Sequence, residues 1–411
     1  MKNLGSSLAP LVLAMTIPVH LMMAATVVVG PAGCHQGSPH FSTVQAAVNA
    51  APGGNVLVCP GTYKEQVVIT TPLVLKGVSY NGSSAAIIAV PSGGLVANSV
   101  LYQSSLWWQY PPIIPLTAQL LVQNTHDVAI SNLVIDGGGL SACGGTPVPA
   151  IPTAAGIAIV NSGQASHPVS VSNTIVRNSC GSGILSDVSL SILQSNDVYN
   201  TGGDSIDVVG DSLPSEVKGN TVAPLTNRAS AMVAIHLVGL CNFVTPTVVN
   251  GNTFNGQMLA DDYCQAKISG NVVEGVTLQQ SSSNYVTSNT ITGLIYICGY
   301  LSCGNQSSDY PPGANGNVIS NNTVSVSPAW IYYGQSYLIG YSCGGGNLIQ
   351  SNVVAGGGIS MNDTAGGFCN YGSNTVRYNT IQGTKCGIAT NGQLNSTFYG
   401  NTLIGVTSNT C

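Results

Sequence analysis

Short groups of β-branched and apolar residues recur along the chain, and a polar corner containing asparagine accompanies each group. The series includes Ser131-Asn132-Leu133-Val134 and Ser172-Asn173-Thr174-Ile175 and closes with Gly400-Asn401-Thr402-Leu403. Successive corner asparagines are separated by 18 to 41 residues, and the shorter steps lie between 18 and 24. A fixed minimum with occasional longer steps predicts coils of one size with loops inserted between them. The corner asparagines are Asn132, Asn173, Asn196, Asn220, Asn252, Asn271, Asn289, Asn322, Asn352, Asn379 and Asn401.

The length and composition of the repeat favour strands over helices. Helical solenoids need about 33 to 47 residues per unit, and Val, Thr and Gly disfavour helix. We therefore predict an all-β fold: a single right-handed parallel β-helix over 26–411, a solenoid of about 18–24-residue coils. We expect each corner asparagine to adopt the left-handed conformation and to stack on the next. Loop inserts are expected near 95–120, 137–155, 299–316 and 327–346.

The N-terminal part predicts a cover for the first coil. Apolar residues recur at helical spacing over 44–51, before Pro52-Gly53-Gly54, and Ser42 to Gln45 fits a capping box. We expect this amphipathic helix to close the end of the solenoid. A strand over 26–30 beside 56–58 would bring Cys34 and Cys59 together.

Residues 1–25 have the pattern of an export signal. Lys2 is the only charge before the apolar run 8–17, and the small residues Ala24 and Ala25 follow. The run is short for a membrane span, and no later stretch of the sequence is long and apolar enough. We predict a secreted protein, extracellular or periplasmic, with no transmembrane segment after signal removal.

All twelve cysteines follow residue 33, and an even number behind an export signal predicts disulfides. Zinc is disfavoured because no pair has CxxC spacing. Residues 31–34 only weakly resemble a lipid-attachment box, and lipidation of Cys34 would leave an odd number of thiols. We expect the pairs Cys34–Cys59, Cys143–Cys180, Cys241–Cys264, Cys298–Cys303, Cys343–Cys369 and Cys386–Cys411.

Charge is scarce along the whole chain. Charged residues make up 6% of the sequence, the net charge is −5 and apolar residues make up 44%. This apolar fraction excludes disorder. Nine lysines and arginines cannot form the basic stripe that nucleic-acid binding requires, so nucleic acid is excluded as a partner.

Three N-terminal segments resemble the opening of pectate-lyase-like β-helix proteins: FSTVQAAVNAA (41–51), VLVCPGTYKEQV (56–67) and LVLKG (73–77). The asparagine repeat that follows is similar to the generic coil of the same superfamily. The resemblance implies a right-handed parallel β-helix. It implies no single activity, because the superfamily includes polysaccharide lyases, glycoside hydrolases, pectin esterases, tailspikes and proteins without known activity.

The chain departs from the catalytic motifs of this superfamily. The paired-aspartate and Gly-His-Gly motifs of polygalacturonases are absent as a set, although Asp261-Asp262 forms an isolated pair. Lyases commonly combine calcium with a basic residue, and lysine and arginine are few here. No catalytic residue is therefore transferred from the resemblance.

Register within the repeat predicts a candidate catalytic site. Successive coils lie about 4.8 Å apart, so outward residues at one strand position form a row. The strand that follows each asparagine turn was aligned with its counterparts in the other coils. The residues taken to point inward are Ile157, Ile184, Ile206, Ile235, Met258, Val276 and Ile359. The outward row is then Ala158, Leu185, Asp207, His236, Leu259, Thr277 and Ser360. Asp207 and His236 become stacked neighbours, and we add Asp204, Asp261 and Asp262 as candidate catalytic residues.

Three chemical interpretations of these residues stay open. A carboxylate beside a histidine can orient a general base, and paired aspartates can cleave a glycosidic bond. Asp204, Asp207 and Asp211 are instead weak candidates for calcium, the only cofactor considered. The third interpretation is that the aspartates only cap turns.

Other polar residues are interpreted as structural. Asp127, Asp136 and Asp363 stand beside asparagine, glycine or histidine and are expected in turns. His126 and His167 are expected to be surface residues without a partner.

Aromatic residues gather in the predicted inserts. Exposed rings offer flat faces for sugars. The alternative is that the inserts fold back and bury their own rings. The candidate substrate-binding residues are Trp107, Trp108, Tyr110, Trp330, Tyr332 and Tyr333.

Together these features predict a secreted β-helix protein that binds or acts on an extracellular polysaccharide or cell-surface glycan. If it is an enzyme, it is a glycoside hydrolase or lyase with acidic residues on one outer strand face. The alternative is a non-catalytic adhesion or structural protein.

Overall fold

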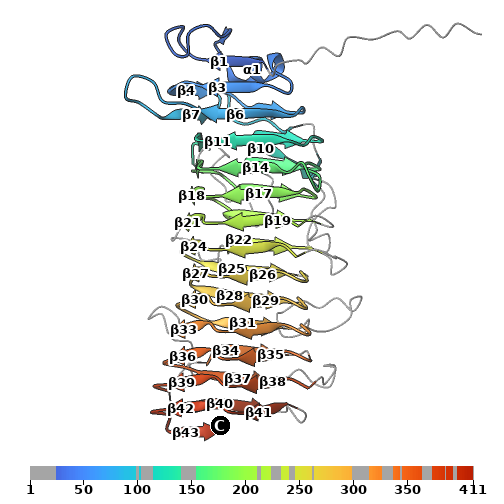
Figure 1. Cartoon of the computed structure of the whole chain (residues 1–411), viewed down its shortest axis with the longest axis vertical. Coiled ribbons are helices and arrows are strands. Elements are labelled where there is room, and N and C mark those ends of the chain that lie inside the picture. The colour runs from blue at the N-terminus through green and yellow to red at the C-terminus, as the bar shows by residue number, and fades with distance from the viewer. Residues whose placement is uncertain are drawn as a thin grey trace, which may run out of the picture.

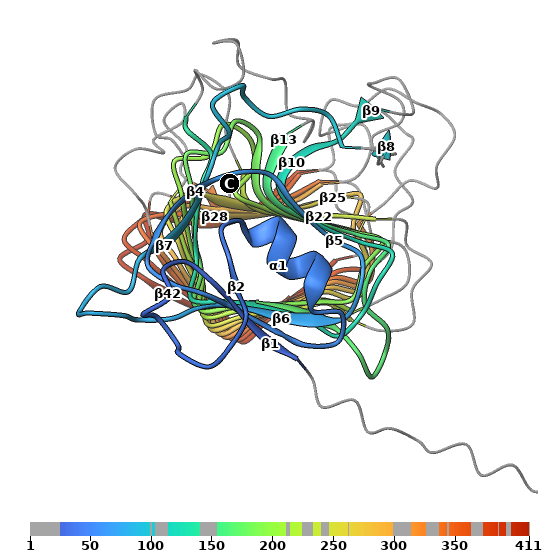
Figure 2. The same cartoon turned by 90° about the horizontal axis from the view of Figure 1, so that it is seen from above.

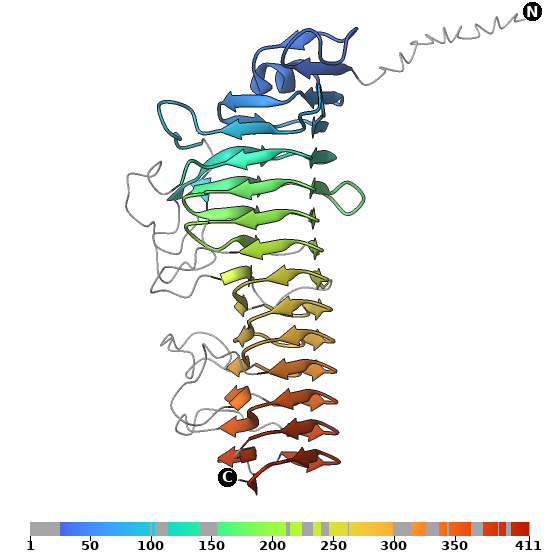
Figure 3. The ribbon, with the colours of Figure 1, turned by 90° about the vertical axis from the view of Figure 1, so that its left-hand side faces the viewer.

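The computed structural model shows a rod of stacked coils, each built from three short parallel strands (Figures 1 and 3). We number the three sheets in the order in which the chain visits them within a coil. The described residues are 25–98, 101–102, 114–139, 154–210, 214–223, 233–239, 246–261, 263–298, 314–325, 337–342, 345–362, 373–384, 386–391 and 396–410. In this part of the chain the sheets have 15, 13 and 13 strands, and a two-stranded sheet lies beside them.

The first sheet contains, in spatial order, β2 (His40–Phe41), β1 (Thr26–Val29), β3 (Asn55–Val58), β6 (Leu73–Gly77), β11 (Val128–Ser131), β14 (Val169–Ser172), β17 (Ser191–Gln194), β20 (Glu216–Lys218), β23 (Val248–Asn250), β26 (Lys267–Ser269), β29 (Tyr285–Thr287), β32 (Val318–Ser320), β35 (Leu348–Gln350), β38 (Thr375–Arg377) and β41 (Thr397–Tyr399).

The second sheet contains β4 (Gly61–Lys64), β7 (Ala86–Ala89), β12 (Val134–Asp136), β15 (Ile175–Arg177), β18 (Asp197–Tyr199), β21 (Thr221–Ala223), β24 (Thr253–Phe254), β27 (Val272–Val273), β30 (Thr290–Ile291), β33 (Thr323–Ser325), β36 (Val353–Ala355), β39 (Thr380–Gln382) and β42 (Thr402–Ile404).

The third sheet contains β5 (Val67–Ile69), β10 (Thr117–Gln123), β13 (Ala154–Val160), β16 (Ser182–Asp187), β19 (Ile206–Val209), β22 (Val233–Val238), β25 (Gln257–Asp261), β28 (Gly275–Gln279), β31 (Ile295–Cys298), β34 (Tyr337–Ser342), β37 (Gly358–Asn362), β40 (Cys386–Asn391) and β43 (Ser408–Thr410). The additional pair is β8 (Leu101–Tyr102) with β9 (Ile114–Pro115), which is antiparallel.

The core is a single apolar column that runs along the rod. Strands such as β11 and β14 alternate strictly between buried and half-buried positions, as expected for a sheet with one face inside. The seven inward residues aligned from the sequence all have 0% exposure. Val and Ile dominate this column because β-branched side chains suit a pleated surface packed on one face.

Stacked asparagines line the corner between the first and second sheets. In each step, the side-chain nitrogen of one asparagine donates to the side-chain oxygen of the next, at 2.9–3.0 Å. The members of this ladder are Asn196, Asn220, Asn252, Asn271, Asn289, Asn322, Asn352, Asn379 and Asn401. The predicted column of corners is therefore confirmed.

The predicted backbone conformation of these asparagines is wrong. The residue before each ladder asparagine has positive φ, as in Ser195 (54°), Gly219 (60°) and Tyr378 (56°). Asn132 and Asn173 do have positive φ, but they stand one position earlier in their coils, and Thr174 occupies the ladder position instead. The left-handed residue turns the chain, which frees the following asparagine to point inward and stack.

A second ladder, missed in the sequence, lines the corner between the third and first sheets. It runs through Asn284, Asn317, Asn347 and Asn374, with side-chain hydrogen bonds of 3.0–3.1 Å. Two of the three corners are thus tied by buried amides in this half of the rod.

Helix α1 (Val44–Ala50) lies across the N-terminal end of the rod (Figure 2). Val44, Ala47, Val48 and Ala51 are buried against the core column. The cap is Thr43, not Ser42 as the capping box implies, because the Thr43 hydroxyl accepts from the Ala46 N–H. The Glu65 carboxylate accepts from the Val44 and Gln45 N–H groups and satisfies two more free donors.

Disulfides follow the prediction where the structure describes both partners. Strand β1 pairs with β3, and Cys34 is bonded to Cys59. Cys180, Cys264 and Cys386 are also disulfide-bonded. Their expected partners Cys143, Cys241 and Cys411 lie outside the described residues, as do Cys303, Cys343 and Cys369, so those pairings stay predictions.

The remaining predictions concern the insert near 327–346 and the export signal. Strand β34 (Tyr337–Ser342) lies within the range 327–346 where an insert is expected, and it continues the third sheet by pairing with β31. The predicted signal lies outside the described residues except for its last position. Among the described helices, none has the length and apolar character needed to span a bilayer.

Candidate active site

The outward row of the third sheet has the register predicted from the sequence. Leu185 pairs with Asp207, Asp207 with His236, and His236 with Leu259. Asp207 lies on β19 and His236 on β22, so the two residues are vertical neighbours although 29 positions separate them in the chain. Asp204 lies in the turn that leads into β19.

The third sheet differs from the other two because its outward side chains are also buried in these coils. Leu121, Ala158, Leu185, Val209 and Val238 point away from the core column, yet they form a second apolar cluster with at most 6% exposure. The outward positions of β11 and β14, in contrast, are half-buried. The outer face of the third sheet is therefore an environment of low polarity, in which charges interact strongly.

Asp204, Asp207 and His236 form one connected cluster on this face. His236 Nδ1 lies 2.9 Å from Asp204 Oδ2 and 3.6 Å from Asp207 Oδ1. The Val233 N–H donates to Asp204 Oδ1 at 3.1 Å, and the Ser182 hydroxyl donates to Asp207 Oδ2. Each carboxylate is thus held by one contact to the scaffold and one to the imidazole.

Burial and charge shift the proton affinities of this cluster. Burial, together with the negative charge of Asp204, raises the pKa of Asp207 to about 7. Burial alone would lower the pKa of His236, but the hydrogen bond to Asp204 and the carboxylate charges around the ring outweigh it and raise the pKa to about 9. Near neutral pH the cluster therefore holds an imidazolium beside a carboxyl that is half protonated.

Asp261 is a third buried carboxyl whose charge acts on the histidine. It lies on β25, one coil beyond His236, and its negative charge contributes to the raised pKa of the ring. Burial raises the pKa of Asp261 itself. Among the described residues, neither Asp261 Oδ1 nor His236 Nε2 has a hydrogen-bond partner, although both atoms are buried. Buried polar atoms normally have hydrogen-bond partners. These two atoms therefore indicate that a water molecule or a hydroxyl group of a ligand binds here.

The remaining candidate residues lie outside the described residues. This applies to Asp262 and Asp211 and to the six aromatic residues Trp107, Trp108, Tyr110, Trp330, Tyr332 and Tyr333, so their roles stay predictions. The role of Asp204 and Asp207 as weak calcium candidates also stays a prediction, and in the structure their oxygens contact an imidazole, a hydroxyl and an N–H group.

His126 and His167 do lie at the surface, but the prediction that they have no partner is wrong. Both rings contact the carboxylate of Asp127, at 3.0 and 2.9 Å. Asp136 does lie in a turn, where it accepts from the Gly138 N–H, and it also forms an ion pair with Arg177 at 2.8 Å. Asp136 and Arg177 are register partners on β12 and β15, so the repeat could have indicated their contact, whereas His167 reaches Asp127 from a turn that the repeat does not describe.

Comparison with known proteins identifies the fold. No protein-family model matches the chain, and no curated protein matches it. Among solved structures, the family 6 alginate lyase AlyGC shares 13% identity over 94% of this chain and 53% of its own, with a TM-score of 0.57. A mannuronic acid-specific family 6 polysaccharide lyase from the human gut microbiota shares 10% identity over 88% of this chain and 86% of its own, with a TM-score of 0.52. This chain thus spans about half of the length of the first of these.

Identities this low concern the backbone alone. The continuous parallel sheets, the stacked corners and these two likenesses agree. The chain has the right-handed parallel β-helix fold of the pectate-lyase-like proteins.

Proposed function

We propose that this protein is a secreted enzyme that cleaves an extracellular polysaccharide by acid–base catalysis at the Asp204–Asp207–His236 cluster. The observation that carries the proposal is the burial of two carboxyls against one imidazole, with both the Asp207 and the His236 pKa raised. Groups whose pKa is strongly shifted by burial and by a specific charge partner concentrate at functional sites. The predicted export signal and the polysaccharide lyases of the same fold support the location and the substrate class.

The three residues suit different roles. Asp207, with a pKa of about 7, is the candidate general acid that gives its proton to the leaving glycosidic oxygen. The Asp204 carboxylate attacks the anomeric carbon as that bond breaks, and water then hydrolyses the glycosyl ester. Asp204 holds the imidazolium through Nδ1 and fixes the ring orientation. The Nε2–H of His236 and the free oxygen of Asp261 are then available for hydroxyl groups of the substrate.

Hydrolysis fits this cluster better than elimination. In the described part of the chain, no lysine or arginine contacts Asp204, Asp207 or His236, so no basic side chain is placed to neutralise a uronate carboxylate. One carboxylate oxygen of Asp204, one of Asp207 and one imidazole nitrogen of His236 lie within 4.8 Å of one another. Such close carboxyls are nearer to the spacing of about 5 Å in retaining glycosidases than to the wider spacing of inverting ones.

A substrate screen tests the proposal directly. Purified protein is incubated with a panel of neutral and acidic polysaccharides, and the products are assayed for new reducing ends and for unsaturated sugars. Reducing ends without unsaturation are expected. Unsaturated products would replace hydrolysis by lysis, and retention of a glycan without any product would favour the non-catalytic binding protein.

The stability of the protein should fall as pH rises from about 4 to 9. Asp207, whose pKa is about 7 in the folded protein, binds its proton more tightly there than in the unfolded chain. As pH rises, the carboxyl ionises first in the unfolded chain, which favours unfolding and lowers the stability of the fold. His236 acts in the same direction, because its stabilising proton is lost as pH rises through about 9. For Asp207 alone the loss is on the order of 4 kcal/mol.

Thermal melts between pH 5 and 8 measure this effect. Asp207→Asn should show a clearly smaller fall in melting temperature than the wild type. Asp197→Asn, at an exposed position on β18, is the matched control and should follow the wild type. Equal slopes for Asp207→Asn and the wild type would show that Asp207 does not hold its proton in the fold.

A further inference from the structure

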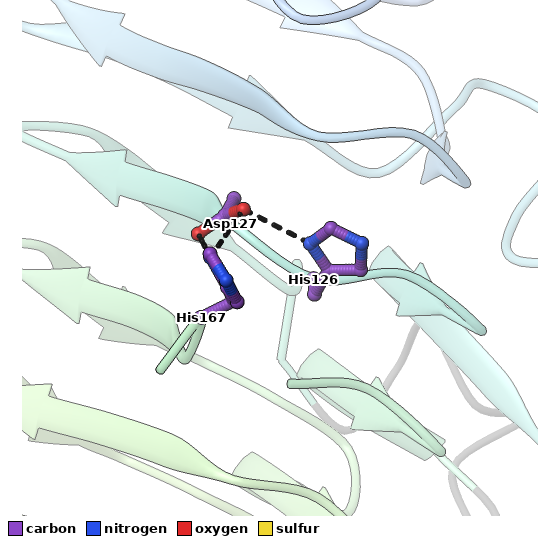
Figure 4. Close-up of side chains that lie close together, drawn as sticks. All are labelled: His126, Asp127 and His167. Carbon is purple, nitrogen blue, oxygen red and sulfur yellow. Dashed lines mark hydrogen bonds and ion pairs between the residues drawn. The ribbon is translucent and has the colours of Figure 1, made fainter. Parts of the chain in front are cut away.

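A second cluster of chemically active side chains lies at the corner between the third and first sheets, two to three coils before the strand that carries Asp207. His126 and Asp127 occupy the turn between β10 and β11, and His167 ends the turn that precedes β14. These are the same corner of two successive coils. Figure 4 shows both imidazoles directed at the single carboxylate between them.

The donor atoms of this cluster are spaced as ligands of one small ion. His126 Nδ1 lies 3.0 Å from Asp127 Oδ2, and His167 Nδ1 lies 2.9 Å from both oxygens of the same carboxylate. The two ring centroids are 5.4 Å apart. Zinc-type ions bind imidazole nitrogen and carboxylate oxygen at about 2.0–2.2 Å, which places neighbouring ligand atoms slightly farther apart than these contacts. One ligand atom from each of the three residues lies within 4.8 Å of the other two, which is close enough for the three to converge on one ion.

The backbone holds the three residues in place without an ion. Gln164 and His167 exchange two backbone hydrogen bonds, of 3.1 and 2.8 Å, which close a tight hairpin turn. That turn is joined to the first coil because Gly163 N–H donates to the Thr125 carbonyl at 2.8 Å and Asp127 N–H to the His167 carbonyl at 3.4 Å. Asp127 also has the left-handed φ of 52° that aims its carboxylate between the rings. Preorganised ligands lose less conformational freedom when an ion binds.

Donor type and exposure decide which ion fits. Two imidazoles and one carboxylate suit Zn²⁺ and similar divalent transition-metal ions, whereas calcium prefers oxygen ligands alone. The side chains are 38%, 44% and 50% exposed for His126, Asp127 and His167. An ion can therefore enter from solution and keep water in its remaining coordination positions.

We propose that His126, Asp127 and His167 form a binding site for one divalent transition-metal ion of the Zn²⁺ class. The bound ion links two successive coils and fixes the 164–167 turn against the 124–127 turn. The site is independent of the proposed catalytic cluster, since the two share no residue. The competing arrangement is a cluster in which Asp127 merely accepts hydrogen bonds from both rings.

Calorimetric titration with ZnCl₂ after removal of metals with EDTA tests the site on the full chain. The wild type should bind one equivalent in a saturable manner, and its melting temperature should rise with zinc. His167→Asn and Asp127→Asn should each weaken binding at least tenfold. His35→Asn, an exposed histidine with positive φ that asparagine tolerates, is the control and should bind like the wild type.

The asparagine variant at His167 separates the two arrangements, because its amide N–H can still donate to Asp127 while it cannot replace the imidazole as a zinc ligand of similar strength. Loss of zinc binding with an unchanged melting temperature in EDTA supports the metal site. The proposal is overturned if the wild type shows no saturable zinc binding, or if His167→Asn binds zinc as tightly as His35→Asn.

Discussion

Asp207→Asn should reduce kcat by a factor of about 10² to 10⁴ on the polysaccharide that the protein cleaves. Asparagine keeps the size of the side chain and can still pair with the Ser182 hydroxyl, but it cannot supply a proton to a leaving oxygen. The loss should appear mainly in kcat and much less in KM, because the change removes an interaction made in the transition state.

Folding should be preserved in this variant. The Asp207 carboxyl, with a pKa of about 7, is partly charged at neutral pH, and burial of this charge costs desolvation free energy. The neutral amide of asparagine does not carry this cost. The melting temperature at pH 8 should therefore equal or exceed that of the wild type. Asp197→Asn again serves as the control and should keep full activity. Unchanged turnover in Asp207→Asn would remove this residue from the mechanism, while the fold and the zinc proposal would stand.

Asn289→Ala should lower the free energy of unfolding by about 3 kcal/mol or more. The Asn289 side chain accepts from the Asn271 backbone and side-chain nitrogens, and it donates to the Ile268 carbonyl and to Asn322 Oδ1. Alanine leaves these buried groups without a partner, and each unsatisfied group costs about 1–3 kcal/mol. Asn289 itself is 1% exposed, so water cannot replace the lost contacts without opening the corner.

Urea unfolding followed by far-UV circular dichroism measures this loss. The matched control is Asn250→Ala, because Asn250 is exposed and, among the described residues, its side chain donates only to the Ser269 hydroxyl. Its effect should stay within about 0.5 kcal/mol. If Asn289→Ala is no more destabilising than Asn250→Ala, the ladder does not stabilise the rod as its hydrogen bonds indicate.

The sequence predicted the register of the candidate site because a solenoid converts a repeat in sequence into a column in space. Once Ile206 and Ile235 are recognised as equivalent inward residues, the stacking of Asp207 on His236 follows. The burial of the pair did not follow, because it depends on what covers the outer face of the third sheet. The approach of Asp204 to the ring also depends on a turn conformation that spacing does not reveal.

Two features were missed in the sequence for different reasons. The ladder from Asn284 to Asn374 has the same steps of 33, 30 and 27 residues as the first ladder over these coils, but it contains only four asparagines and so forms a much shorter repeat. His126 and His167 are brought together by a hairpin turn inserted before β14, which the coil period does not describe. The sequence pattern did not show which residue of each corner has positive φ. Either the asparagine or the residue before it could take this conformation without changing the repeat.

The ladder of equivalent corners makes the rod a molecular ruler. Each coil advances the structure by a single inter-strand spacing of about 4.8 Å. Duplication or deletion of one complete coil would lengthen or shorten the protein by that step and leave the chemistry inside each remaining coil intact. Gain or loss of coils in related proteins can therefore change the distance from the coil of Asp207 to either end of the rod. The residues around Asp207 stay unchanged.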